Sequence, residues 1–278
     1  FFLVTSPMSS IIRRSFLFKS PPPLSEEEQE NLKQNRKKKQ TKFAWLANFL
    51  RARPSQKTLK DKGIIEEPNN VFFGVPIADI YKRPENLEEN IPRPLYLCTK
   101  ELRKYITIEG VFRVSGIFSE MNRLKEAFEA GEEPNFSEVA SIHSISGLVE
   151  LWFRELPEPL TTHALYDNFM ACVAEDIPEE QSVNELKLLI EKLNEETQTV
   201  LSFFLKLMEK VAQAEDENKM GSKNLGVVFG SILLGGAVLC FSLGLKTTLE
   251  RQNRVVQLMI ENQETLIPSQ SFPVFDEF

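Results

Sequence analysis

The sequence has few of the residues on which hydrolytic and metal chemistry depends. It contains two histidines, three cysteines and two tryptophans in 278 residues. Cys98, Cys172 and Cys240 lie far apart and form no CxxC pair, so we expect neither a disulfide framework nor a zinc site. This use of cysteine fits a reducing, intracellular compartment, and we expect a cytoplasmic protein.

The common enzyme motifs are also missing from the sequence. It has no GxxxxGK[ST] or GxGxxG segment for phosphates, no GxSxG nucleophile elbow and no HExxH metal pair. His143 lies among apolar helical positions and His163 at an expected helix start, so structural roles are favoured over catalysis for both. We therefore expect no autonomous chemistry, no metal and no cofactor of the chain's own.

Charge is distributed unevenly along the chain. Residues 1–61 hold 13 Lys/Arg and 5 Asp/Glu, a balance of +8, whereas the whole chain carries −7 and the remainder therefore −15. Residues 1–70, which we call the N-terminal arm, include a capping-box pattern that predicts a helix over 25–52, followed by a linker. We expect no nucleic-acid binding, because the body is acidic and has no base-reading motif.

A basic run followed by aromatic residues stands out in the arm. This pattern is typical of a helix on an anionic membrane surface or of a calmodulin-like target, and a solvated linker helix that docks on the body is the simpler alternative. The membrane hypothesis places the contact at Arg36, Lys37, Lys38, Lys39, Phe43 and Trp45.

One uncharged run is long enough to cross a bilayer. It covers residues 225–245 and includes Gly226 and Gly230 in a GxxxG pattern. The Gly235–Gly236 pair instead indicates a buried helix that ends there, which we favour over a membrane span.

Helical periodicity dominates from Val71 onward. It predicts a buried face at Leu95, Cys98, Leu102 and Tyr105. A second predicted helix is capped by Ser119, and further helices follow near 142–156, 160–174, 181–193, 197–214, 219–234 and 250–264. No alternating strand pattern is evident. We therefore predict a single all-α domain over 71–267 and a tail over 268–278.

One arginine lies in a glycine-flanked segment, "EGVFRVSG" (109–116), between two predicted helices. The guanidinium of Arg113 is permanently charged and matches phosphoryl oxygens well. A chain without a phosphate cradle can offer such a group only to another protein's nucleotide, as an arginine finger does. For a single arginine taken alone, an ordinary surface or capping role is the default interpretation.

Several further segments accompany this one in order. The chain resembles the RhoGAP domain, the GTPase-activating module for Rho-family small GTPases, which implies an all-α fold and activation of GTP hydrolysis in trans. The segments are "FFGVPI" (72–77), "EGVFRVSG" (109–116), "RLKEAFEAGE" (123–132), "LWFRELPEPL" (151–160), "NKMGSKNLGVVFGSILL" (218–234) and "NRVVQLMIENQETLI" (253–267).

The resemblance implies roles for individual residues. Arg113 matches the family's arginine finger, with Gly110 and Gly116 supporting its loop and with Phe112 and Val114 expected to anchor it. Arg154 matches an arginine that braces the loop, and Asn224 an asparagine that contacts the GTPase. The local alternatives are a helix C-terminal charge for Arg154 and a helix-start polar group for Asn224.

Two departures from the family pattern bear on activity. Glu150 stands where the family usually has a lysine that helps bind the GTPase, which reverses a charge at that site. Segment 235–246 is apolar where a polar loop is usual. The resemblance thus implies a GTPase activator whose partner supplies GTP and magnesium, and the alternative is an inactive or weakly active Rho-binding adaptor.

Overall fold

The computed structural model describes residues 70–235 and 245–267. Contacts divide the chain into two units, Phe1–Glu67 and Pro68–Phe278, and the described residues all belong to the second unit. The predicted helix over 25–52, the rest of the N-terminal arm, the greater part of segment 235–246 and the tail over 268–278 lie outside the described residues.

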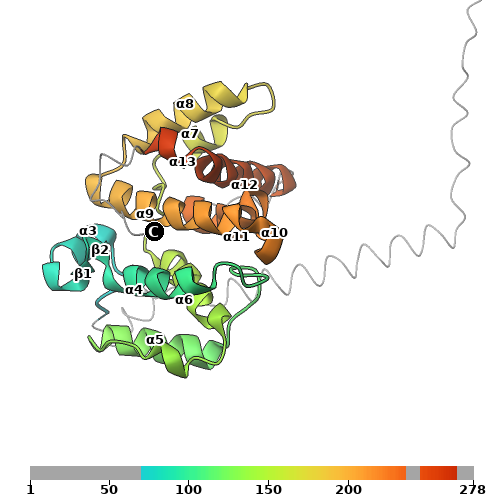
Figure 1. Cartoon of the computed structure of the whole chain (residues 1–278). Coiled ribbons are helices and arrows are strands. Elements are labelled where there is room, and N and C mark those ends of the chain that lie inside the picture. The colour runs from blue at the N-terminus through green and yellow to red at the C-terminus, as the bar shows by residue number, and fades with distance from the viewer. Residues whose placement is uncertain (1–69, 236–244, 268–278) are drawn as a thin grey trace, which may run out of the picture. The chain divides into compact units, whose positions relative to one another are not determined.

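Helices form nearly all of the regular structure in the described ranges, which confirms the predicted all-α class (Figure 1). Their order along the chain is α3 (Ile77–Tyr81), α4 (Arg93–Leu102), α5 (Phe118–Glu129), α6 (Ile142–Glu155), α7 (Tyr166–Ala171), α8 (Glu179–Ile190), α9 (Glu195–Gln213), α10 (Glu215–Asn218), α11 (Ser222–Leu234), α12 (Leu245–Glu261) and α13 (Gln263–Leu266). Three short 3-10 helices are η1 (Pro84–Asn86), η2 (Arg103–Tyr105) and η3 (Phe136–Glu138).

A small hairpin was not expected from the sequence. Strands β1 (Leu87–Glu88) and β2 (Ile91–Pro92) pair antiparallel, with Leu87 opposite Pro92. The turn residues Glu89 and Asn90 have φ values of 48° and 61°, and a positive φ at both positions is typical of a type I′ hairpin turn. Two-residue strands show no alternation, so periodicity could not reveal them.

Local signals explain two helix ends, and one expected cap is absent. The Asn194 side chain accepts the Thr197 amide at 2.8 Å and caps α9, and Leu156 leaves the helical region before Pro157 and so ends α6. Ser119 was predicted to cap α5, but the helix already begins at Phe118 without a side-chain cap. Ser119 therefore lies inside the first turn.

The core is built on α9, the longest described helix, which contacts α3, α11, α12 and α13. Aromatic rings form a connected row through it, with ring centroids of Phe204 and Phe153 at 4.7 Å and of Phe204 and Phe229 at 4.8 Å. Each fully buried ring contributes about 1.5–3 kcal/mol of stability. Tyr105 is not part of this core: it is 40% exposed, because α4 ends at Leu102 and the chain continues as η2.

Helices α11 and α12 lie side by side and share more contacts than any other described pair (Figure 1). A Cβ added to Gly226 would lie 2.5 Å from the Asn253 carbonyl, and one added to Gly230 would lie 2.6 Å from its Oδ1. The GxxxG pattern therefore serves helix packing inside the domain.

The apolar run 225–245 is not a continuous helix. Helix α11 ends at Leu234, and Gly235 has φ 70°. Across residues 70–235 and 245–267, no helix combines the length and hydropathy that a bilayer crossing requires. Leu225, Phe229 and Leu233 are fully buried against the rest of the domain, as the favoured interpretation expected.

Candidate functional site

Arg113 lies between η2 and α5, on residues 106–117, which we call the finger loop. Its amide and that of Val114 both donate to the Gly110 carbonyl at 2.8 Å, which closes a tight turn. The side chain is 48% exposed and pairs with Glu109 at 3.5 Å, Nη2 to Oε1. Ion pairs between exposed side chains contribute at most about 1 kcal/mol, so the guanidinium can leave Glu109 for a stronger anion.

Phe112 anchors the finger loop in the core. The residue is 2% exposed, and its ring meets the edge of Phe229 at a centroid distance of 5.4 Å. It has φ 65°, a conformation that costs a non-glycine residue about 1–3 kcal/mol. The prediction that Val114 also points into the core was wrong, since Val114 is 45% exposed; because the chain reverses at Phe112, Val111, 1% exposed, is the second anchor.

Two glycines allow the close approaches of this loop. Gly110 has φ 77°, and an added Cβ would lie 2.7 Å from the Val114 side chain. Gly116 packs on the first turn of α6, where an added Cβ would lie 2.5 Å from Ser144 Cα and 2.6 Å from the His143 carbonyl. A side chain at Gly116 would require the loop to move, and one at Gly110 would be strained by the positive φ and would displace the Val114 side chain.

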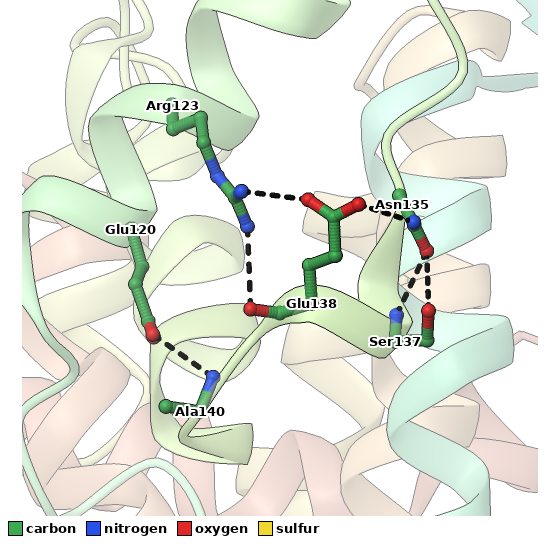
Figure 2. Close-up of polar contacts among 6 residues, drawn as sticks. All are labelled: Glu120, Arg123, Asn135, Ser137, Glu138 and Ala140. Atoms are coloured by element: carbon green, nitrogen blue, oxygen red, sulfur yellow. Dashed lines mark hydrogen bonds and ion pairs between the residues drawn. The ribbon is translucent and has the colours of Figure 1, made fainter.

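Hydrogen bonds fix the C-terminal end of the finger loop to α6. The Ile117 amide donates to Ser144 Oγ at 2.9 Å, and that hydroxyl donates to Glu120 at 2.6 Å. Glu120 also accepts the Ala140 amide at 2.9 Å (Figure 2). The Ser144 and Ala140 hydrogen bonds lower the pKa of Glu120, so this link persists as a carboxylate at neutral pH.

The connection between α5 and α6 is itself held by polar contacts (Figure 2). Arg123 of α5 pairs with the Glu138 carboxylate at 2.9 Å, and Asn135 donates to the same carboxylate at 2.8 Å. The Asn135 side chain also accepts from the amide and hydroxyl of Ser137. These contacts place the start of α6, and hence Ser144, relative to α5.

The N-terminal end of the finger loop joins the segment before α11. The Gly110 amide donates to the Asn218 carbonyl at 2.8 Å. The next carbonyl, that of Lys219, accepts Asn224 Nδ2 at 3.0 Å. Asn224 is exposed in the first turn of α11, so adjacent peptide groups connect it with the loop that carries Arg113.

Arg154 and Glu150 lie on α6, further toward its C-terminal end than the turn that contacts Gly116. A Cβ on Gly147 would lie 3.8 Å from the Gly116 amide, and Glu150 is one turn further along the helix. Arg154 Nη2 lies 3.4 Å from Glu150 Oε2, and the side chains are 55% and 17% exposed. Within the described ranges the ion pair of Arg154 goes to Glu150, and bracing of the finger loop by Arg154 stays a prediction.

The environment of Glu150 shifts its ionisation. Burial raises the pKa of this carboxyl to about 7, and Arg154 opposes the shift only in part. Burial therefore favours the neutral form of this side chain relative to an exposed glutamate.

Glu150→Gln is expected to stabilise the protein at pH 8 and to flatten its stability between pH 4.5 and 7. The native pKa exceeds the ordinary value of 4.5, so the native state binds more protons across this interval and stability falls as pH rises through it. The wild-type cost is fully present above about pH 8 and amounts to about 3 kcal/mol. Urea unfolding at pH 5 and 8 measures it. If the free energy of unfolding changes by the same amount between pH 5 and pH 8 in the wild type and in the variant, the raised pKa of Glu150 is contradicted.

Several site residues could not be found from the sequence motifs. Glu109 carries a usable signal, because it precedes Arg113 by four residues, the spacing of a helical-turn ion pair. Ser144, Glu120 and Asn218 carry none, since their partners come from other elements.

His143, at the contact with Gly116, is half-buried and burial lowers its pKa. Among residues 70–235 and 245–267, no group of three His, Cys, Asp or Glu side chains could hold a metal.

Comparison with known sequences assigns the family. The RhoGAP domain model matches residues 92–237, slightly more than half of the chain, and the chain belongs to the RhoGAP family. It is 29% identical over 243 residues to Rho GTPase-activating protein 32 of Xenopus laevis, and the aligned region covers 84% of this chain and 12% of that protein. It is 34% identical over 198 residues to Rho GTPase-activating protein gacY of Dictyostelium discoideum, and that aligned region covers 69% of this chain and 26% of the relative. The chain thus spans about a quarter or less of these relatives' lengths.

Solved structures agree with this assignment. The crystal structure of human Rho GTPase activating protein 15 superposes with a TM-score of 0.65 at 25% identity, covering 77% of this chain and 99% of that one. The BH domain from Graf, the GTPase regulator associated with focal adhesion kinase, gives a TM-score of 0.56 at 26% identity, covering 63% and 92%.

Proposed function

We propose that this chain binds GTP-loaded Rho-family GTPases through a domain over 71–267 and accelerates GTP hydrolysis by inserting Arg113 in trans. The observation that carries the proposal is the exposed Arg113 guanidinium on a loop fixed at both ends, in a chain of the RhoGAP family. Hydrolysis by Rho-family GTPases with and without this chain tests it: acceleration supports the proposal, and no acceleration contradicts it.

The proposed chemistry is electrostatic. Negative charge on the transferring γ-phosphoryl group is stabilised by a guanidinium with several donors, and the group is most effective when its position is fixed in advance. Phe112 and the bonds from Gly110 and Ile117 supply that fixation here. GTP, magnesium and the residue that orients the attacking water would belong to the GTPase.

Exposed apolar side chains near Arg113 support a protein partner. Ile108, Val114 and Ile117 are 41–45% exposed, and Phe118 is 74% exposed. Large apolar side chains grouped at the surface commonly mark protein contacts. On α11, Val227 is 59% exposed and lies one turn after Asn224. We infer that Asn224 and these side chains contact the GTPase and that Arg154 braces the finger loop in the complex.

Glu150 favours a second candidate, a Rho-binding adaptor with weak or no activity. Its carboxylate is 17% exposed beside Arg154 on the helix that supports the finger loop. A negative charge there weakens binding to acidic groups or phosphates of a partner. The intact finger loop favours the activator over the adaptor.

Glu150→Lys is expected to raise kcat/KM for stimulated hydrolysis about tenfold, because it removes a repulsion of about 1–3 kcal/mol. Glu150→Gln, which removes only the charge, should give a smaller gain of the same sign. Initial rates over a range of protein concentrations measure both. Unchanged rate and affinity in both variants would rule out repulsion at this position.

The N-terminal arm, which lies outside the described residues, is proposed to bring the domain to anionic membranes through Arg36, Lys37, Lys38, Lys39, Phe43 and Trp45. Sedimentation with phosphatidylserine-containing liposomes should recover the full chain, and recovery should fall in high salt and when the four basic residues become alanine. Equal sedimentation of the full chain and the four-alanine variant would contradict the proposal.

A further inference from the structure

We propose that Asn218 is a positioning residue that holds the finger loop where Arg113 can act, an inference that rests on the proposed function. Asn218 is the last residue of α10 and is 0% exposed. It lies more than a hundred residues from the finger loop in sequence, yet it contacts both the entry to this loop and its turn.

The side-chain amide of Asn218 makes three hydrogen bonds. Its Nδ2 donates to the Ile106 carbonyl at 2.7 Å and to the Val211 carbonyl at 2.8 Å. Its Oδ1 accepts the Met220 amide at 2.7 Å. The site therefore joins the first residue of the finger loop to the end of α9 and to the segment that enters α11.

The backbone of Asn218 adds the second contact with the loop. Its carbonyl accepts the Gly110 amide at 2.8 Å, and the Gly110 carbonyl in turn accepts the amide of Arg113. Two hydrogen bonds thus lead from the buried Asn218 to the backbone of Arg113. Within residues 70–235 and 245–267 the exposed side chain of Arg113 makes one ion pair, the weak one with Glu109, so the backbone of the finger loop sets where this side chain starts.

Asparagine is the side chain that fits this site. It must donate two hydrogen bonds and accept one at a fully buried position. Serine is too short to span the same three groups, and aspartate would place a carboxylate oxygen against two carbonyls. A substitution therefore leaves buried peptide groups unpaired, which the loop can relieve only by moving.

The following residue extends the same control to Asn224. Lys219 has φ 61°, and this left-handed turn brings its carbonyl to Asn224 Nδ2. The peptide groups of 218 and 219 thus set the finger loop and the first turn of α11 together. A shift at Asn218 would displace Arg113 relative to Asn224.

A double-mutant cycle tests the inference on the full chain. Asn218→Ser should lower single-turnover stimulated hydrolysis about 100-fold, because a displacement of about 1 Å is enough for such a loss. In the Arg113→Ala background the same substitution should change the rate by less than twofold, since its effect passes through Arg113. Binding to the GTPase loaded with a non-hydrolysable GTP analogue should change by less than threefold. An unchanged rate in the single variant, or an equal loss in both backgrounds, would overturn the inference.

A control separates positioning from lost stability. Leu186→Ala removes a fully buried side chain on α8, which contacts α7, α12 and α13, and it should destabilise the fold while the stimulated rate of the folded protein stays within twofold. If Asn218→Ser does not fold, amide exchange of the wild-type chain decides. The Gly110 amide should exchange at least 100-fold more slowly than an unprotected amide, and fast exchange would overturn the inference.

The measurement on the wild-type chain distinguishes failure of the proposed function from failure of the inference about Asn218. If no Rho-family GTPase responds to the wild-type chain, the proposed function fails. In that case Gly110 exchange still reports whether the Asn218 carbonyl holds the loop, and a protected amide supports this backbone contact of the inference. If the wild type is active and the cycle shows no coupling, only the inference about Asn218 fails.

Discussion

Replacing Arg113 with alanine is expected to lower stimulated GTP hydrolysis by a factor of about 10³–10⁵, the contribution of an arginine finger to phosphoryl transfer. The loss should lie in the rate constant at saturating protein. The side chain is half exposed and its removal opens no core cavity, so unfolding should be unaffected. Single-turnover rates with excess chain over GTPase measure the effect.

Two comparisons sharpen the Arg113 experiment. Arg113→Lys keeps the charge but loses the planar set of donors, and it should recover only a small part of the rate. Arg254→Ala removes another ion-paired, partly exposed arginine, on α12, and should leave the rate within twofold. A loss in Arg254→Ala as large as in Arg113→Ala would contradict a specific role for Arg113.

Gly116→Ala is expected to lower the stimulated rate about 100-fold while the domain remains folded. The added Cβ would lie 2.5 Å from Ser144 Cα, a backbone atom of α6 that cannot rotate away. The finger loop must therefore move, and a shift of about 1 Å at the reacting group costs about two orders of magnitude. Stimulated rates and thermal unfolding of the variant measure the two parts of this prediction.

Gly131→Ala is the matched control for Gly116→Ala. Gly131 has φ 75°, but no heavy atom lies within 4 Å of an added Cβ, so the change strains α5's end without pushing on the finger loop. We expect a loss of stability of about 1 kcal/mol and an unchanged stimulated rate. Full activity in Gly116→Ala would show that the contact with α6 does not position Arg113.

The fold was largely predictable because one face of each long helix is buried. Helix α6 shows this most clearly, since Ile145, Leu148 and Trp152 follow the helical period and all lie in the core. The errors have local causes. Tyr105 continues the period of α4 past the point where the chain becomes a 3-10 helix, and the hairpin of β1 and β2 is too short to alternate.

The candidate site was predictable only in part. Arg113 was predicted as a site residue from its residue type and glycine neighbours together with the resemblance to the RhoGAP domain, and its role as an arginine finger stays a prediction. Asn218 was not predicted as a site residue, because its contact with the finger loop is a hydrogen bond to the Ile106 carbonyl, 112 residues away. For Glu150 the sequence showed a reversed charge, but only the structure shows the burial that raises its pKa to about 7. Tertiary contacts of this kind leave no periodic signal.

The apolar run 225–245 shows how length alone misleads. Its glycines suggested either a membrane helix or a break, and the described part supports the break after Leu234. Close packing of Gly226 and Gly230 against Asn253 explains why small residues are needed there. Helices that pack closely inside a domain and helices that pack closely in a membrane both need small residues at their contact.

Single-turnover GTP hydrolysis by a panel of Rho-family GTPases, each with and without the full chain, tests the central claim most directly. At least one GTPase should be accelerated by several orders of magnitude, and Arg113→Ala should remove that acceleration while binding of the GTP-loaded partner persists. Binding without acceleration in the wild type would contradict the activator and leave the adaptor. Acceleration that survives in Arg113→Ala would contradict the finger mechanism.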